Sequence, residues 1–310
     1  MEFEFTPIEY PNSVWTEANG IAWTGPLHRT LEIVGTYGDA SGATHGFVHS
    51  GGNYTPLDVP NQKNTTCNGI NARGQIVGTF DRLTPFPEGN YSFVYENGTW
   101  TTWTDSVQPN VEVVLYGINN SGSVVGLIND PVAEISSDAY MFDAASGRSL
   151  TSPQGHAGSM VGIRGINNSG QCVGYSNSTS EAPGTTVGSY YASLTPVISS
   201  VITAPTAAAT YSTGITDSGV VCGYATYDGH RVFENAFVYK NGAFTTFEFN
   251  NFGTQQEKVT EARGITSSPS GPTTAGGAIS IVGFWSKYQN TPTSHQGFLA
   301  TEVVARPPAR

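Results

Sequence analysis

The chain has 310 residues, of which 13 are Lys or Arg and 24 are Asp or Glu, so its formal net charge is −11. This balance argues against nucleic acid or an anionic membrane surface as a partner, because both attract basic proteins. No apolar run approaches the length of a membrane span. A chain of this length can bury a large core as one all-β domain.

A Gly-Ile pair recurs along the sequence at intervals of 48 to 50 residues. The pairs begin at Gly20, Gly69, Gly117, Gly165, Gly214 and Gly264. In the second copy another glycine, Gly78, follows nine positions after the first. A repeat of this length, filled with strand-forming residues, is typical of a propeller or a related array.

Each repeat is expected to form four short strands. In the second repeat we predict strands at 67–71, 75–80, 92–95 and 99–104, which are rich in β-branched and aromatic residues. Polar turns that end in glycine, such as Asn-Ala-Arg-Gly, separate the first two strands. The repeats start near residues 17, 66, 114, 162, 211 and 261.

The N-terminus predicts how the array closes. Residues 5–12 match residues 54–61, which form the fourth strand of the first repeat, whereas the sixth repeat ends without a fourth strand. We therefore expect residues 4–12 to complete the last blade and protect its edge. The sequence predicts an all-β fold: a single six-bladed β-propeller domain of four-stranded blades over residues 1–310.

The sequence also predicts a secreted glycoprotein. Seven Asn-X-Ser/Thr sequons are present, and we expect glycans at Asn64, Asn90 and Asn177, beside variable loops, rather than at Asn119 and Asn167, in tight turns. The first residues do not form a signal peptide, so we expect a mature chain of the secretory pathway. The three cysteines are expected to be free core thiols; they are Cys67, Cys172 and Cys222.

Common catalytic motifs are missing from the sequence. It contains no Gly-X-Ser-X-Gly elbow, zinc-binding His-Glu-X-X-His motif or phosphate-binding glycine loop, so we expect neither a cofactor nor a metal. His45 and His295 precede the third strands of their repeats at equivalent places, which favours a structural role over metal binding.

Loop placement suggests where a ligand binds. The connections between second and third strands, and between blades, share one face, and loops on a rigid scaffold commonly carry binding residues. Aromatic residues on this face include Tyr37, Phe80, Phe86, Tyr175, Tyr190, Tyr191, Tyr224, Tyr227, Trp285 and Tyr288. On the opposite face the enlarged first hairpins of blades 1 and 6, at 23–30 and 267–278, are expected either to plug the channel or to form a subunit contact.

One residue precedes each Gly-Ile pair, where we expect the inner strand to start. These residues are Asn19, Asn68, Tyr116, Arg164, Thr213 and Arg263. Two arginines at this place have two interpretations: structural ion pairs between blades, or recognition of an oxygen-rich ligand in a central pocket.

The repeat resembles the extracellular HAF repeat. The resemblance rests on Gly-Ile-Asn-X-X-Gly-X-Val-Val-Gly followed by a His-Ala-Phe-like strand, seen at 45–47, 235–239 and 296–298. It covers nearly the whole chain and implies a propeller. Together with the sequons, it is also similar to the glycosylated hetero-Diels-Alderases of fungal tropolone-sesquiterpene biosynthesis.

That second resemblance implies a pericyclase that joins a tropolone-type quinone methide to a humulene-type olefin by [4+2] addition. Such a reaction needs two apolar partners held in near-attack geometry, and hydrogen bonds to the heterodiene oxygen. Under this hypothesis the catalytic candidates are Arg164, Arg263, Tyr116, His156 and Lys287. The substrate-binding candidates are Trp285, Tyr288, Tyr191, Tyr227 and Phe80.

The alternative is a secreted, non-catalytic, lectin-like propeller. Aromatic platforms beside Asn and Asp suit a sugar as well as a terpenoid, and a fold by itself does not specify function. In either case we expect a small molecule as the partner, apolar or aromatic for the pericyclase, no nucleic acid and no membrane span. A homo-oligomer is compatible with both.

Overall fold

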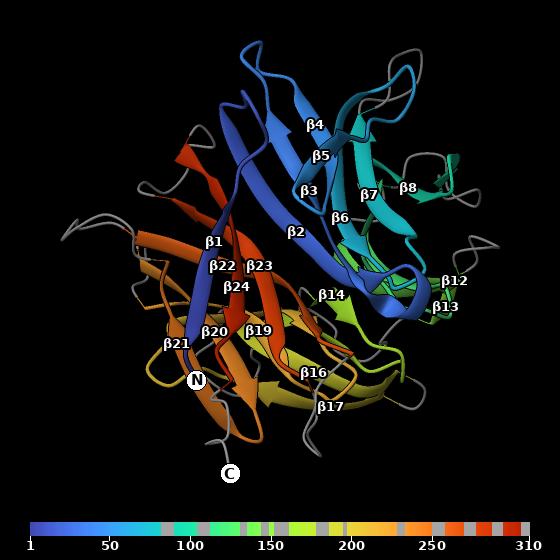
Figure 1. The fold of residues 1–310 in the computed structure, drawn as a ribbon. Coiled ribbons are helices and arrows are strands. Elements are labelled where there is room, and N and C mark those ends of the chain that lie inside the picture. The colour runs from blue at the N-terminus through green and yellow to red at the C-terminus, as the bar shows by residue number, and fades with distance from the viewer. Residues whose placement is uncertain are drawn as a thin grey trace.

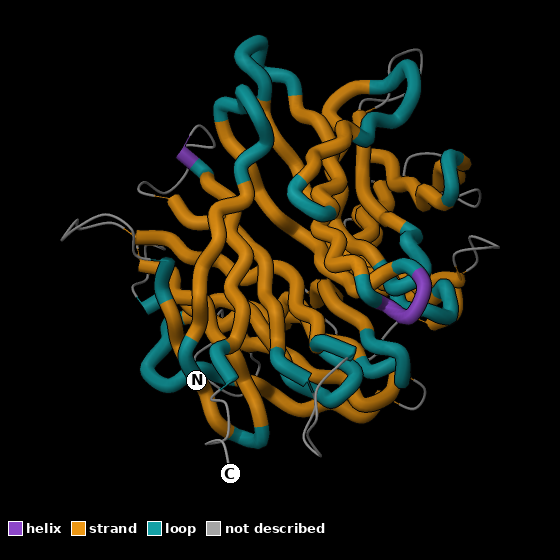
Figure 2. Tube along the Cα trace, in the orientation of Figure 1, coloured by secondary structure: helices purple, strands orange, loops and turns teal. Residues whose placement is uncertain are grey.

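The structure is a computed structural model. It describes residues 1–81, 90–103, 112–130, 135–143, 149–151, 161–177, 186–194, 197–227, 233–249, 258–269, 277–286 and 294–304. Strands dominate this part of the chain, and the short 3₁₀ turn η1 (Pro26–His28) interrupts them (Figure 2). The predicted all-β fold is confirmed. None of the described helical segments is long and apolar enough to cross a membrane.

The strands form antiparallel groups of four in chain order. The first group contains β2 (Trp15–Thr24), β3 (Thr30–Gly38), β4 (Thr44–Ser50) and β5 (Asn53–Pro56). The second contains β6 (Lys63–Ile70), β7 (Ile76–Asp81), β8 (Asn90–Glu96) and β9 (Thr99–Trp103). The third contains β10 (Glu112–Ile118), β11 (Ser123–Asp130), β12 (Ile135–Asp143) and β13 (Ser149–Thr151). The fourth contains β14 (Val161–Ile166), β15 (Cys172–Asn177), β16 (Thr186–Leu194) and β17 (Val197–Ile202).

Two more groups are joined into one sheet by a short parallel pairing. One contains β18 (Ala209–Ile215), β19 (Val221–Thr226), β20 (Phe233–Lys240) and β21 (Ala243–Phe247). The other contains β22 (Lys258–Ser267), β23 (Ile279–Ser286), β24 (Gln296–Glu302) and β1 (Phe3–Ile8). Strand β1 pairs antiparallel with β24, so the two ends of the chain share a sheet, and Figure 1 shows blue β1 beside red β24.

The first strands of the groups line the axis of the molecule. Each first strand contacts the first strand of the next group, and β22 contacts β2. We call these six strands (β2, β6, β10, β14, β18 and β22) the inner strands. Each Gly-Ile pair lies near the end of its inner strand, just before the hairpin, except in β2 and β22, which continue a few residues further. The expectation that the pair marks the strand start was therefore wrong, because several residues before it also pair with the second strand.

Glycines let the inner strands approach closely. A Cβ added to Gly69 would stand 2.6 Å from the Tyr116 carbonyl oxygen and 3.3 Å from the Cα of Gly117. Equivalent contacts of each Gly with the Gly of the next group join Gly20 to Gly69, Gly117 to Gly165 and Gly165 to Gly214. The first glycine of the repeat is thus required by packing around the axis.

The core lies between neighbouring sheets. Four phenylalanines at matching places of their third strands are fully buried: Phe47, Phe93, Phe237 and Phe298. Each of these rings faces a glycine of the second strand, and a Cβ added to Gly78 would stand 2.7 Å from the ring of Phe93. The second glycine of the repeat therefore makes room for the Phe of the His-Ala-Phe-like strand. The three cysteines are buried and free, as expected.

Candidate functional site

A β-bulge turns one residue of every inner strand toward the axis. The register between first and second strands shifts at the residue before each Gly-Ile pair, as between Ile163 and Gly165 and between Ala262 and Gly264. The same shift occurs in the other four groups. A bulge inserts one extra residue and re-aims its side chain. We call the six bulged residues, which are Asn19, Asn68, Tyr116, Arg164, Thr213 and Arg263, the axial residues.

Three of the axial residues fasten neighbouring sheets together. The Asn19 amide donates to the Cys67 carbonyl (3.1 Å), and the Asn68 amide donates to the Leu115 carbonyl (2.8 Å). Thr213 makes the same link to the Ala262 carbonyl (2.8 Å) through its hydroxyl group. Asn and Thr at these positions are therefore structural.

The other three axial residues form a cationic, aromatic layer. The Arg164 guanidinium lies 3.7 Å from the ring centroid of Tyr116 and 5.6 Å from that of Tyr175. Arg263 lies 5.1 Å from the ring of Phe284 and 5.9 Å from that of Tyr224. Cation–π contacts of this kind stabilise a guanidinium while leaving its in-plane N–H groups available.

Arg263 has an acidic partner on its own strand. Its Nη2 lies 2.6 Å from Oε2 of Glu261, two residues earlier on β22, at an angle that is not that of a hydrogen bond. This ion pair is within one strand, not between blades as one interpretation expected. Burial disfavours charge on Arg263, but Glu261 together with Tyr224, Glu17 and Tyr116 outweighs this effect and raises the pKa of the guanidinium, so it stays charged. Burial raises the pKa of Tyr224, and Glu261 adds to this rise.

Two cavities lie along the axis in the part of the chain that the structure describes. The axial cavity, of about 70 Å³, is lined by the six axial residues and by the Gly-Ile pairs. The mouth cavity, of about 290 Å³, lies on the face that carries the first hairpins, which we call the hairpin face. The six isoleucines of the Gly-Ile pairs line both cavities and so form the boundary between them.

The lining of the mouth cavity is polar and differs around its rim. Trp23 and His28 from the first hairpin of blade 1 contribute one side, and Ser267, Ser268 and Pro269 from the last group contribute another. Asn and Asp side chains of the remaining hairpins complete the rim; they include Asn120, Asn168 and Asp217. The mouth cavity therefore combines one indole with hydroxyl, amide and carboxylate groups.

The hairpins around the mouth are held by a relay of asparagines. The Asn71 carboxamide oxygen accepts from the backbone N–H of Arg73 and Gln75 (both 3.0 Å), and its amide donates to the Asn119 carbonyl (2.8 Å). Asn119 in turn donates to the Asn167 carbonyl (3.2 Å), and Asn167 to that of Thr216 (3.1 Å). The Asn of Gly-Ile-Asn thus shapes its own turn and ties it to the next.

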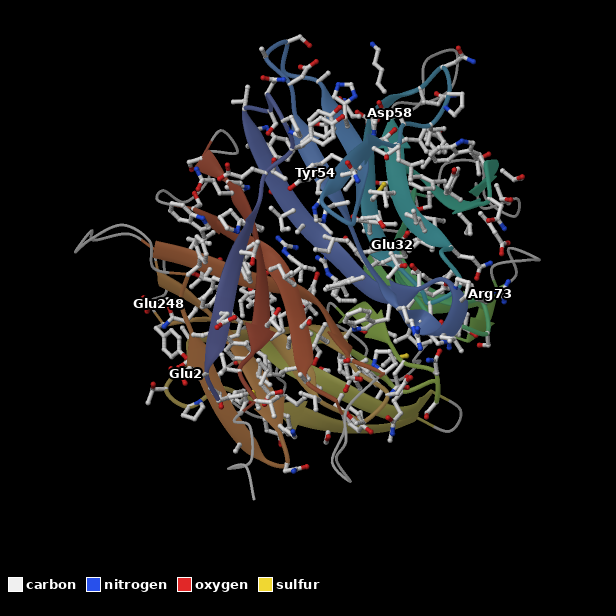
Figure 3. The ribbon with its side chains drawn as sticks, in the orientation of Figure 1. Glu2, Glu32, Tyr54, Asp58, Arg73 and Glu248 are labelled. Carbon is white, nitrogen blue, oxygen red and sulfur yellow. The ribbon has the colours of Figure 1, made fainter. Side chains whose placement is uncertain are left out.

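A second relay lies further out on the same rim. Asn120 accepts from the backbone N–H of Ala72 (2.9 Å), and Asn168 from that of Asn120 (2.8 Å). Asp217 ends the series, because both of its carboxylate oxygens accept from Asn168 (2.8 Å each). Arg73, labelled in Figure 3, projects from this rim and pairs with Glu96 (3.3 Å). The rim is thus rigid, and the exposed Asp217 gives it a fixed negative group.

The structure brings together part of the predicted catalytic set. Arg164, Arg263 and Tyr116 line the axial cavity. His156, Lys287 and Tyr288 lie outside the described residues. Most of the variable connections, such as residues 82–89 and 178–185, also lie outside them.

The described substrate-binding candidates do not line either cavity. Phe80 and Tyr191 are 3% and 6% exposed and pack in the core between sheets. Tyr227 is half-buried against another core cluster. Trp285 lies beside Phe249, with ring centroids 5.7 Å apart. Their positions on or just after second or third strands, away from the inner strands, account for this placement.

Sequence reasoning missed the mouth cavity as the larger described site. It placed function on the opposite face, since the loops there vary more. The signal that could have found the mouth was the enlargement of two first hairpins, which supply Trp23, His28 and Ser268. Asp217 lies in the Thr-Asp-Ser-Gly turn of its repeat, so the sequence indicated a role in the turn and not in a binding site.

The glycosylation candidates differ in what the structure describes. Asn64 is exposed, and its amide donates to Asp81 (2.5 Å). Asn90 begins β8 and Asn177 ends β15. Asn119 and Asn167 are 5% and 3% exposed, and the absence of glycans from these tight turns stays a prediction.

The two histidines at the starts of third strands, His45 within β4 and His295 just before β24, have acidic partners. His45 Nδ1 lies 2.8 Å from Asp58, also labelled in Figure 3, and Nε2 lies 3.4 Å from Asp39. His295 Nδ1 lies 2.5 Å from Glu17. The described residues contain no group of His, Cys, Asp and Glu suited to a metal. These pairs fix loops, as a structural role requires.

Comparisons with known proteins support the fold. No protein-family model matches the sequence, and no curated protein matches it. A mutant of Aleuria aurantia lectin in complex with alpha-methyl-L-fucoside is similar, with a TM-score of 0.52 and 17% identity over 93% of each chain. AofleA from Arthrobotrys oligospora has a TM-score of 0.49 and 12% identity over 93% of this chain and 84% of its own. The likeness to the first structure shows a shared β-propeller fold, and the HAF-repeat resemblance remains a resemblance.

Proposed function

We propose that the protein is a carbohydrate-binding β-propeller whose ligand site is the mouth cavity. The observation that carries this proposal is the lining of that cavity, which joins the Trp23 indole to hydroxyl, amide and carboxylate groups from several hairpins. A sugar ring presents C–H groups on its faces and hydroxyl groups at its edge. A lining with one apolar surface and many polar groups matches that chemistry.

The dimensions and rigidity of the mouth support the same conclusion. Ligand pockets commonly start at roughly 300 Å³, and the mouth cavity of about 290 Å³ suits one or two sugar residues. The asparagine relays hold its polar groups in place before a ligand arrives, which lowers the entropic cost of binding. The similar lectin of Aleuria aurantia, described in complex with alpha-methyl-L-fucoside, is a propeller with a sugar ligand.

The pericyclase hypothesis has less support. It requires room for two apolar partners beside Arg164 and Arg263, whereas the axial cavity measures about 70 Å³ within the described residues. Arg263 is paired with Glu261, and Arg164 is stacked on Tyr116. Neither the lining nor the likeness to lectins favours a cycloaddition.

Secretion fits a carbohydrate-binding function. The seven sequons and the low content of Lys and Arg are those of a secreted glycoprotein. We include secretion in the proposal, with glycans at surface positions such as Asn64.

Glycan-array screening followed by calorimetric titration of the best monosaccharide tests the proposal. Trp23→Ala should weaken the affinity at least about tenfold, because it removes the apolar surface of the site. Trp23→Phe should restore part of the affinity, since a flat aromatic face remains. Asp217→Ala should weaken binding independently by removing a hydrogen-bond acceptor for a sugar hydroxyl.

Leu27→Ser provides a matched control. Leu27 lies in the same enlarged hairpin and is 73% exposed, but it does not line the mouth cavity. Its replacement should leave affinity unchanged. The proposal fails if no glycan binds the wild-type protein, or if Trp23→Ala binds the selected sugar as tightly as Leu27→Ser does.

A further inference from the structure

The axial cavity holds an excess of positive charge in a protein of net charge −11. Arg164 and Arg263 both line it, and Glu261 pairs with Arg263. Glu17, whose Oε1 lies 2.5 Å from His295, also acts on Arg263 and not on Arg164. One guanidinium charge therefore remains without a carboxylate among the described residues.

Arg164 is the residue that lacks an acceptor. Its guanidinium stacks on Tyr116 at 3.7 Å and lies near Tyr175, and no described residue accepts a hydrogen bond from it. Stacking occupies the faces of the group but not its edge, where five N–H donors lie. Those donors are available to a planar oxyanion.

Arg263, which lines the same cavity, has a buried donor without a partner among the described residues. Its Nε is buried and has no hydrogen-bond partner in the described structure. A buried donor without a partner is costly, as is a partly buried charge without a counterion. A single anion in the cavity between these two residues would relieve the cost of the uncompensated charge.

We propose that the axial cavity is a binding site for one monovalent oxyanion, the carboxylate of a small molecule or of an acidic sugar. The volume of about 70 Å³ admits a carboxylate group but not a whole sugar ring. Asn19, Asn68 and Thr213 complete the lining with neutral polar groups. Arginine is the residue best suited to hold a carboxylate, because its fork of donors matches the two oxygens.

This site is separate from the mouth cavity. The six isoleucines, each between 6% and 8% exposed, lie between the two. The oxyanion site can therefore exist whether or not the mouth binds a neutral glycan. Failure of one proposal leaves the other in place, because Trp23 tests the mouth and Arg164 tests the axial cavity.

Calorimetric titration of sodium acetate into the wild-type protein at constant ionic strength tests the inference. We expect one acetate per chain. In a second series of titrations at increasing sodium chloride concentration, the affinity for acetate should fall. Arg164→Met should keep the packing of the arginine stem and reduce the affinity at least about tenfold, because charge-assisted hydrogen bonds are lost. Arg164→Lys, which keeps the charge but not the fork, should bind with intermediate affinity.

Lys63→Met is the matched control, because it removes one positive charge from an exposed position on another inner strand. It should bind acetate like the wild-type protein. Circular dichroism establishes that each variant is folded, and if Arg164→Met does not fold, Arg164→Lys supplies the comparison.

Glucuronate and glucose identify the source of the carboxylate. Tighter binding of glucuronate than of acetate, with no axial binding of glucose, indicates an acidic sugar. Binding of acetate alone indicates a free small carboxylate. The inference is overturned if neither acid binds, if chloride binds as tightly as acetate, or if the folded Arg164 variant binds acetate as the Lys63 variant does.

Discussion

Gly264 in the last inner strand packs directly against Gly20 in the first. A Cβ added to Gly264 would stand 3.2 Å from the Cα of Gly20 and 2.9 Å from the carbonyl oxygen of Asn19. The same kind of contact joins consecutive inner strands elsewhere, so the strands surround the axis without a gap at the chain ends. This closure brings axial residues that are far apart in sequence into one cavity.

The glycines at the axis should tolerate alanine unequally. Gly69→Ala would place a methyl group 2.6 Å from a backbone oxygen, which cannot move alone, and should cost about 1 to 3 kcal/mol of unfolding free energy. Gly214→Ala is the matched comparison, because its closest contacts are side-chain atoms of Cys222 and Ile265 at 3.1 Å. Urea unfolding should give Gly69→Ala a lower free energy of unfolding than Gly214→Ala. Equal losses of stability in the two variants would contradict this account.

Deletion of residues 1–12 should destabilise the last sheet. The deletion removes β1 from the edge of β24 and exposes the core around Phe298, against which Phe5 packs edge to face at 5.9 Å. An unpaired edge strand is prone to association with other chains. We expect a lower melting temperature and concentration-dependent aggregation by light scattering, whereas the exposed Glu4→Ala control should behave as wild type. An unchanged melting temperature of the truncated protein would refute this role of the N-terminus.

Much of the scaffold could be predicted from the repeat alone. The predicted strand at 75–80 corresponds to β7 (Ile76–Asp81), because a short run of apolar and β-branched residues bounded by turns defines it. The predicted strand at 67–71 begins four residues too late, since β6 starts at Lys63 and carries a bulge between Lys63 and Thr66. Polar residues with an irregular register leave little trace in the hydrophobic pattern.

The site was only partly predictable. Arg164 and Arg263 each directly precede a Gly-Ile pair, so the sequence predicted equivalent positions for them. The arrangement of the inner strands around the axis brings both residues into one cavity. The pair Arg263–Glu261 could not be chosen in advance, because the bulge decides which side chains of β22 face the same way. The mouth cavity depends on how two enlarged hairpins fold over the axis, which spacing does not encode.

Glycan occupancy should follow amide accessibility. The side-chain amides of Asn119 and Asn167 are buried and donate to the next hairpin, so a chain glycosylated there could not close its turns. After expression in a eukaryotic secretory host, peptide mapping should find glycans among Asn64, Asn90 and Asn177. A glycan on Asn167 in folded protein would contradict this prediction, as would intact masses unaffected by glycosidase.

His45 and His49 on β4 should respond oppositely to pH. Burial lowers the pKa of His45, but hydrogen bonds with Asp58 and Asp39 outweigh it and raise the pKa above 6.5. Protonated His45 therefore stabilises the fold below about pH 6.5, and this contribution is lost as pH rises through the raised pKa. Burial lowers the pKa of His49, so its neutral form contributes stability above about pH 6.5 that is lost as pH falls.

His45→Gln should therefore lower the melting temperature at pH 6 by roughly 1 to 3 °C, the size expected of a partly exposed ion pair, and change it little at pH 9. His49→Gln is the control on the same strand. Because this variant lacks the buried imidazole whose pKa is lowered, its melting temperature should fall less between pH 9 and pH 6 than that of the wild type. Melting curves of both variants and the wild type at pH 6 and pH 9 measure the difference. If His45→Gln lowers the melting temperature equally at both values, the charge of His45 plays no part and only its packing against Tyr37, at a ring separation of 5.1 Å, stabilises the loop.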